Sequence, residues 1–279
     1  MPAFKVNQIF FDKKSREILD PGFVPLDNTE NLRPDWYEFW VIRNYLHTNK
    51  LDENAWYGFL SPSFADKTGL SSQDLYGFLN RIDGHADVAI LTHGWDQIAY
   101  FLNLFEQGEY WHPGLIEIAE IFFKDAGINL DVKSYIAHSQ NSVFSNYFVA
   151  KPIFWRRWIE IADKLFECAE NQSNKLFNRL RGSCSYVSSG RGTEMKVFIQ
   201  ERIAPALLAS ENFRVIAAEL SPQLPVFNVL FNEDVRTRRL LIVCDTMKLE
   251  YCSSKDDTYL DVYKKIRSSI STNRHVQLL

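Results

Sequence analysis

The chain has 279 residues, of which 46% are hydrophobic and 14% aromatic, so it has enough apolar material for one large α/β domain or two small ones. Its formal net charge of −4 excludes an overall positive field that would hold a nucleic-acid backbone or an anionic membrane, although a local basic patch remains open. The first residues lack a signal-peptide pattern, and no run reaches the ~18 apolar residues that span a bilayer, so we expect a soluble, cytoplasmic protein without a transmembrane segment.

The first half of the chain alternates short apolar runs with helical patterns, which is typical of α/β proteins. Pro34 and Asp35 are expected to open a helix, and Gly127 to follow the end of another. Strands are predicted at 4–11, 55–61 and 86–91, and helices at 71–82, 95–105 and 115–125.

The second half begins with "SVFSNYFVAKPIFWRRWIEIADKLF", where a strand at 142–150 is expected to lead into a helix that starts at Pro152. Ser145 and Asn146 stand where the hydrophobic rhythm changes. Beyond it the sequence predicts a loop at 178–194, a helix at 195–210 that bends near Pro205, a late strand within 238–254 and a final helix at 257–270.

Several familiar signatures are absent. The chain contains no G-x-G-x-x-G, no P-loop, no G-x-S-x-G, no H-E-x-x-H and no Asp-x-Asp. Its cysteines are scattered, without a C-x-x-C pair or a suitably spaced histidine, so they are expected to be reduced thiols and no metal-ligand set is predicted; they are Cys168, Cys184, Cys244 and Cys252.

A set of motifs nevertheless occurs in a fixed order, from "NQIFFD" through "WYEFWVIRNYL", "WYGFLSPSF..KTG" and "SNYFVAKPIFWRRW" to "GTEMKVFIQERIAPALL". Together these motifs resemble those of bacterial glycosyltransferases of polysaccharide-biosynthesis loci. They cover residues 5–210 in order and spacing, although each one is short.

The resemblance implies a single α/β domain of the Rossmann-like GT-A type, with a mixed central sheet flanked by helices. The expected core is about 5–210, followed by a C-terminal helical extension at about 211–279. The implied activity is transfer of a sugar from a nucleotide-sugar donor to a glycan or lipid-linked acceptor in surface polysaccharide synthesis. Such enzymes often hold Mn²⁺ or Mg²⁺ against the diphosphate, and the missing Asp-x-Asp leaves that ion open.

Two positions carry the expected chemistry. Asn146 has an amide that can donate to and accept from sugar hydroxyls, and the alternative is that it bonds to nearby backbone. Glu201, in the "F-x-x-E-R" motif, is the expected general base that deprotonates an acceptor hydroxyl, and the alternative is a surface pair with Arg202. Arg202 is also a candidate to neutralise a donor phosphate.

Further substrate-binding candidates come from two segments with loop character. In "FEQGEYWHPG", the expected break of a helix presents Glu106, Glu109, Trp111 and His112 to a ligand, with a packed turn as the alternative. Arg191 lies between two glycines in a segment that is expected either to close over a diphosphate or to be an ordinary surface loop.

Asp87, at the start of a predicted strand, is a donor-site candidate, whereas His85 and His93 are expected to be structural. Glu38 lies among aromatic residues, and we expect it to pair with a basic side chain, with a role in the donor site as the alternative.

A second hypothesis is a carbohydrate-binding or scaffold protein that has kept the fold and lost the chemistry, and the missing Asp-x-Asp favours it. A third hypothesis is a transferase or hydrolase that uses Asp87 and His112. It is the weaker one, because no nucleophile motif accompanies these residues.

Overall fold

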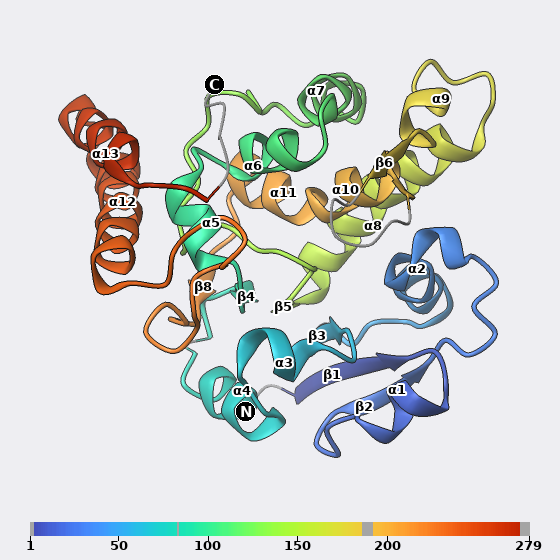
Figure 1. The fold of residues 1–279 in the computed structure, drawn as a ribbon. Helices are drawn as coiled ribbons and strands as arrows, with labels where there is room; N and C mark the ends of the chain where they lie inside the picture. The colour runs from blue at the N-terminus through green and yellow to red at the C-terminus, as the bar shows by residue number, and fades with distance from the viewer. Residues whose placement is uncertain (1–2, 83, 186–191, 274–279) are drawn as a thin grey trace.

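The computed structural model describes residues 3–82, 84–185 and 192–273, and its centre is a six-stranded mixed sheet (Figure 1). The strand order is β2-β1-β3-β5-β4-β8, and β5 alone is antiparallel to its neighbours. The expected mixed sheet flanked by helices is therefore confirmed. The strands are β1 (Ala3–Phe10), β2 (Val24–Asp27), β3 (Ala55–Leu60), β4 (Val88–Ile90), β5 (Phe148–Ala150) and β8 (Val215–Ala217).

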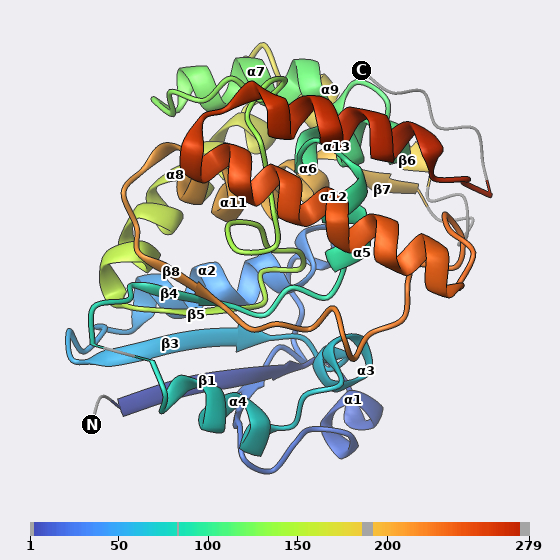
Figure 2. The ribbon, with the colours of Figure 1, turned by 90° about the vertical axis from the view of Figure 1, so that its left-hand side faces the viewer.

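Helices cover both faces of this sheet, as Figures 1 and 2 show. On one face, Trp155 of α8 (Pro152–Glu170) donates its indole N–H to the Tyr57 carbonyl of β3 at 2.9 Å and packs edge-on against Phe59. On the other face, Tyr76 of α4 (Ser72–Leu79) lies 6.3 Å from the ring of Phe4 in β1. The alternation of side chains along the strands thus buries both faces.

The remaining elements frame the sheet. They are α1 (Lys13–Glu17), η1 (Pro34–Trp36), α2 (Glu38–Thr48), α3 (Phe64–Thr68), α5 (Trp95–Tyr100), α6 (Leu104–Trp111), α7 (Leu115–Asp125), α9 (Phe177–Leu180), α10 (Met195–Glu201), α11 (Ile203–Ser210) and the hairpin β6 (Ser183–Ser185) and β7 (Gly192–Glu194). Two long helices, α12 (Val235–Ser254) and α13 (Asp257–Ser269), pack together and against α5 around a smaller apolar cluster of their own. Nowhere in the described ranges does a helix combine the length and apolar character that a bilayer crossing needs.

The strand predicted within 238–254 is wrong, because this segment lies inside α12. The Asp234 side chain caps the helix by accepting a hydrogen bond from the Thr237 N–H. The buried residues Leu241, Cys244 and Lys248 recur at helical spacing. Its apolar residues occur on two faces, which weakens the helical pattern in the sequence. The last sheet strand, β8, lies beyond residue 210, where the sequence-based division placed the extension.

Three other boundaries differ from the predictions. The expected strand at 142–150 is only Phe148–Ala150, because Ser145 and Asn146 have positive φ and cannot continue an extended strand. The expected bend near Pro205 occurs instead at Arg202, so that Pro205 lies in the first turn of α11, where a proline is tolerated. Glu106 to Trp111 are helical in α6, and the break follows at His112.

Several strand ends meet at one edge of the sheet, where a ligand site is expected. The carboxyl ends of β1, β3 and β4 lie there, together with the amino end of the antiparallel β5. From β1 the chain adds β2 on one side and then β3 on the other, so the strand order reverses between β1 and β3. In open α/β sheets, ligands bind outside the carboxyl ends of the strands at such a reversal.

Candidate functional site

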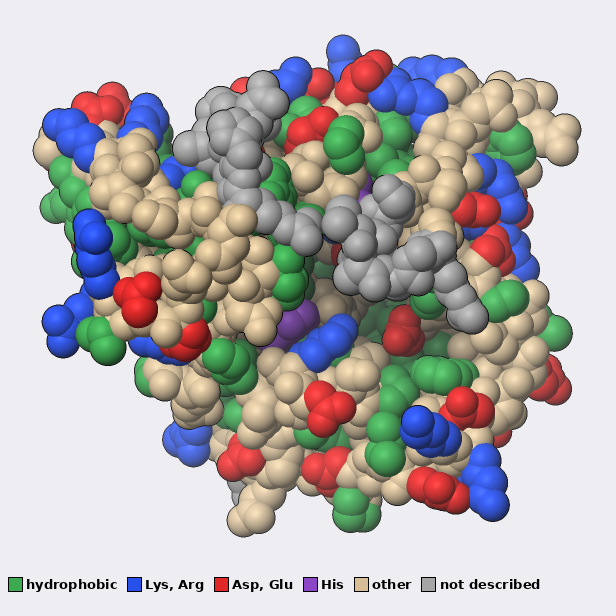
Figure 3. Space-filling model, viewed as in Figure 1, with side chains coloured by type: hydrophobic (Ala, Val, Ile, Leu, Met, Phe, Trp, Pro, Cys, Tyr) green, Lys and Arg blue, Asp and Glu red, His purple; other side chains and the backbone are tan. Residues whose placement is uncertain are grey.

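Two adjoining cavities open at this edge of the sheet, and together they form the candidate cleft. The first cavity, of about 330 Å³, is lined by Tyr37, Glu38, Ser61, Asn146 and Gln200 among others. The second, of about 280 Å³, is lined by residues that include His93, Gln97, Trp111, His112 and Arg202. Lys67, Ser145, Phe198 and Glu201 belong to both linings. Figure 3 shows a hollow near the middle of this face, with histidine, basic and acidic side chains around it.

The backbone is strained around the first cavity. Tyr37 has φ of 48°, and Ser145 and Asn146 both have φ of 55°. Five non-glycine residues in the described part of the chain have positive φ, and these three line the first cavity. Such conformations cost free energy and persist where the surrounding structure enforces them, often at ligand sites.

Two buried amides in the first cavity each have one side-chain atom without a partner among the described residues. Asn146 is 7% exposed and Gln200 is 4% exposed. No described residue bonds to the Asn146 Oδ1 acceptor or to the Gln200 Nε2 donor. Because a buried polar atom without a partner is costly, a ligand that brings both donors and acceptors, as sugar hydroxyls do, would satisfy both amides.

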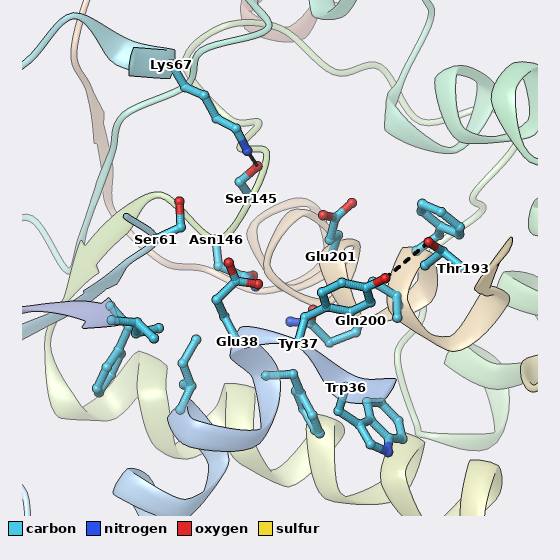
Figure 4. A pocket seen from close by; sticks show the side chains of 16 residues that line it. Trp36, Tyr37, Glu38, Ser61, Lys67, Ser145, Asn146, Thr193, Gln200 and Glu201 are labelled. Atoms are coloured by element: carbon cyan, nitrogen blue, oxygen red, sulfur yellow. Dashed lines mark hydrogen bonds between the residues drawn. The ribbon is translucent and has the colours of Figure 1, made fainter. Parts of the chain in front are cut away.

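Glu201, the last residue of α10, lies at the junction of the cavities. Its side chain is 28% exposed, and it accepts from Arg202 Nη1 at 3.2 Å. Burial raises the pKa of the Glu201 carboxyl, and nearby Glu38 raises it further, whereas the charges of Arg202 and Lys67 lower it; burial prevails. Figure 4 shows Glu201 across the cavity from Glu38 and Asn146.

Lys67 brings a positive charge to the cleft. It lies at the end of α3, and its ammonium donates to Ser145 Oγ at 3.5 Å and lies 5.6 Å from the Tyr147 ring. Its ammonium makes no ion pair with any side chain in the described ranges. A cation in a cleft with no ion-pair partner among the described side chains favours anionic ligands such as a diphosphate.

The second cavity combines aromatic rings with neutral imidazoles. Burial lowers the pKa of His93 to about 3 and that of His112 to about 3, with Lys67 and Arg202 respectively adding to the effect. The His112 ring stacks on Phe198 with centroids 3.5 Å apart. Both imidazoles are therefore uncharged at neutral pH and can accept hydrogen bonds from a ligand.

Most of the predicted site residues lie in this cleft. The structure brings together Asn146, Glu201, Arg202, Trp111 and His112, all in the linings of the two cavities. Arg202 is only 3% exposed and donates to Gln107 Oε1 at 2.9 Å and to the Phe198 carbonyl at 3.0 Å. It braces the wall of the second cavity rather than projecting into it.

Three predicted binding residues lie elsewhere. Glu106 is buried and pairs with Arg267 of α13 at 2.7 Å. Glu109 accepts from the backbone N–H groups of Gly114 and Ile116, and so caps the start of α7. Asp87 precedes β4 at the opposite end of the strand from the cleft, where it pairs with Lys151 and Arg214; Arg191 lies outside the described residues.

The sequence prediction missed several cleft residues. Glu38, expected to pair with a basic residue, lines the first cavity and has no ion-pair partner in the described ranges. His93, expected to be structural, lines the second. Lys67 belongs to the quoted "KTG" and Ser61 directly follows a buried strand, so their positions carried a signal; Gln200 carried none beyond its place next to Glu201.

The described residues contain no cluster of three or more histidine, cysteine, aspartate or glutamate side chains that would bind a metal ion. Glu38, Glu201 and the Asn146 amide supply oxygen atoms of the kind that bind Mg²⁺ or Mn²⁺, so the first cavity is where such an ion would be held.

Comparison with known proteins gives no relative: no family model, no curated protein and no solved structure matches this chain.

Proposed function

We propose that this chain is a glycosyltransferase that moves a sugar from a nucleotide-sugar donor to a hydroxyl of a glycan or lipid-linked acceptor. The observation that carries the proposal is Glu201, a carboxylate with a raised pKa at the junction of two cavities. A transferase needs two adjoining ligand sites with a base between them, since the acceptor oxygen must reach the donor's anomeric carbon.

The reaction assigns each group a role. In a direct displacement, the acceptor oxygen forms a bond to the anomeric carbon while its proton passes to Glu201. The bond from that carbon to the diphosphate breaks, and the nucleoside diphosphate leaves with the electron pair. Lys67 would stabilise the negative charge that develops on the leaving group. A divalent ion, if bound, would supply the same charge stabilisation.

The first cavity suits the sugar part of a ligand. The Asn146 and Gln200 amides provide an acceptor and a donor that no described residue pairs, and the Tyr37 ring, with its hydroxyl 3.4 Å from Thr193 Oγ1, provides an aromatic surface. Figure 4 shows these side chains around one space. Such a mixture of amides, hydroxyls and aromatic rings suits a polyhydroxylated ligand.

A second candidate function is carbohydrate binding without catalysis. It is favoured by the Arg202–Glu201 hydrogen bond, because a carboxylate already engaged by a guanidinium is also the arrangement of an ordinary structural pair. In this reading the cleft binds a sugar and Glu201 only orders its wall.

The experiment combines binding and turnover. Purified protein is screened by thermal shift against UDP, GDP, CMP and dTDP sugars, with and without Mn²⁺, because a ligand at ~100 times its Kd stabilises the fold by about 2.7 kcal/mol. Positive donors are then tested for hydrolysis and transfer with wild type and Glu201→Gln. Turnover that vanishes in a variant that still binds the donor supports transfer. Sugar binding without turnover in either protein supports the binding function, and no binding of any nucleotide sugar refutes the proposal.

A further inference from the structure

The exposed side of α12 has an unusual composition for a water-facing helix. Val235 is 66% exposed, Ile242 is 42% exposed and Val243 is 38% exposed. Arg236 and Arg239 are exposed on the same turns. We call these five residues the α12 stripe.

Helical geometry places the stripe on one surface. Val235, Arg239 and Ile242 follow the spacing i, i+4, i+7, and Arg236 and Val243 lie beside them. The opposite side of the helix is covered, because Leu241, Cys244 and Lys248 are fully buried, and Lys248 donates to the Phe101 carbonyl at 2.7 Å. The other side of α12 therefore packs against the core, and the exposed stripe contributes little to the packing of the fold.

The charge on the stripe is of one sign. None of its five residues is acidic. Three nearby carboxylates are engaged elsewhere: Asp234 caps the helix, Glu233 pairs with Arg238 at 3.0 Å, and Asp245 accepts from Ser139. Glu250 lies on the same side of α12, about two turns beyond Val243. Arg236 and Arg239 make no ion pair with any described side chain. The overall charge of −4 thus conceals a local basic and apolar surface.

In sequence, the stripe begins a few residues after side chains that line the cleft. Phe227 and Val229, 39% and 36% exposed, line the second cavity, and the Phe227 ring lies 6.0 Å from that of Trp111. The segment that carries them leads directly into α12. Figure 2 shows α12 running along the outside of the molecule, above that segment.

We propose that the α12 stripe docks onto an anionic membrane surface. Aliphatic side chains that enter the headgroup boundary, beside arginines that meet anionic lipid, are what an interfacial helix presents. A second copy of the chain fits less well, because two stripes packed face to face would bring unpaired arginines together. The proposal is independent of the reaction in the cleft.

The test is co-sedimentation of the full chain with vesicles of phosphatidylcholine, alone or mixed with phosphatidylglycerol, at low and high salt. Wild type should bind the anionic vesicles and be released by salt, because surface charges are screened. Arg236→Gln with Arg239→Gln should weaken binding roughly 30-fold, about fivefold for each arginine. Val235→Ser with Ile242→Ser should weaken it as well, and the control Ile18→Ser, at a 57% exposed position far along the chain from α12, should not.

All variants change exposed side chains, so their melting temperatures should match that of wild type, and this is measured first. The proposal is overturned if wild type does not bind anionic vesicles, if it binds neutral vesicles equally, or if the stripe variants bind like wild type. It is also overturned if wild type forms a dimer in light scattering that Val235→Ser with Ile242→Ser abolishes, since the stripe would then belong to a second copy.

Discussion

Arg202 and Glu201 are consecutive residues in opposite surroundings, joined by a hydrogen bond of 3.2 Å from Nη1 to Oε2. The guanidinium is buried against Gln107 and the Phe198 carbonyl, whereas the carboxylate reaches both cavities. Because the helix breaks between α10 and α11 at Arg202, the Arg202 side chain turns into the wall of the second cavity and the Glu201 side chain stays at the cleft. The pKa of Glu201 is therefore set by two opposed influences, burial that raises it and a fixed cation that lowers it.

If Glu201 is the base, Glu201→Gln should reduce kcat by roughly 100-fold or more, because general-base catalysis contributes about that much. The donor Kd should change little. In wild type, kcat should rise with pH through the raised pKa of Glu201, since only the ionised carboxylate accepts a proton. A pH profile of kcat for both proteins makes the comparison, and a variant with unchanged kcat would remove Glu201 from the reaction.

The same raised pKa predicts a stability effect with a definite sign. A carboxyl whose pKa is higher in the folded than in the unfolded chain binds its proton more tightly when folded, so folding stability falls as pH rises from the unfolded value through the folded one. Glu201→Gln cannot ionise and should be more stable than wild type at neutral pH, with the difference vanishing near pH 4. Urea unfolding at several pH values measures this, and a less stable variant at pH 7 would mean that the Arg202 pair outweighs the burial.

The backbone at Asn146 allows strain and ligand contact to be separated. With φ of 55°, Asn146→Gly should fold without penalty, whereas Asn146→Ala should cost about 1 kcal/mol. Both lose the buried amide, so both should weaken sugar binding by roughly tenfold. Ser145→Gly is the matched control, since it relieves strain at the neighbouring residue and keeps the amide. Equal sugar affinity in wild type and Asn146→Gly would refute the contact.

The sequence allowed the α/β class, the mixed sheet and half of the cleft to be predicted. Asn146 and Glu201 were named because they belong to two of the quoted motifs, one a predicted strand that leads into an aromatic helix and the other a predicted helix with F-x-x-E-R. Their roles depended on where those elements end, and these boundaries were displaced: Asn146 lies at the amino end of β5 because two positive φ values shorten the strand. The periodicity of side chains does not report such backbone reversals.

The two misassigned glutamates of α6 make their contacts away from the cleft. Glu106 and Glu109 lie in α6 with the cleft residue Trp111, and His112 directly follows this helix, yet the two carboxylates point to α13 and to the start of α7. Which side of a helix faces a cavity depends on packing partners that are remote in sequence, such as Arg267, 161 residues away. Lys67 was missed although it belongs to a quoted motif, because an exposed lysine is normal and the motif does not show that a cleft surrounds it.

Lys67→Gln should weaken binding of the free nucleoside diphosphate by roughly 10- to 100-fold, because a charge-assisted contact to phosphate is lost. It should also raise the pKa of Glu201, whose carboxylate Lys67 stabilises, and so move the rise of kcat to higher pH. Lys67→Arg keeps the charge and should retain the wild-type pH profile. Calorimetric titration with the diphosphate, followed by pH profiles, tests both parts. Unchanged affinity in Lys67→Gln would place the phosphates elsewhere.

Glu106 should be a stability residue rather than a substrate contact. It is 3% exposed, its partner Arg267 is 6% exposed, and their atoms lie 2.7 Å apart across α6 and α13. Glu106→Gln leaves the guanidinium buried without its counterion and should lower the free energy of unfolding by about 3 kcal/mol. Replacing both partners, Glu106→Met with Arg267→Met, should recover most of that loss, because neither residue of the pair then leaves the other's charge buried without its counterion. The KM for the donor, measured for both variants at a temperature at which each is folded, should equal that of wild type. A raised KM at unchanged stability would return Glu106 to the binding site.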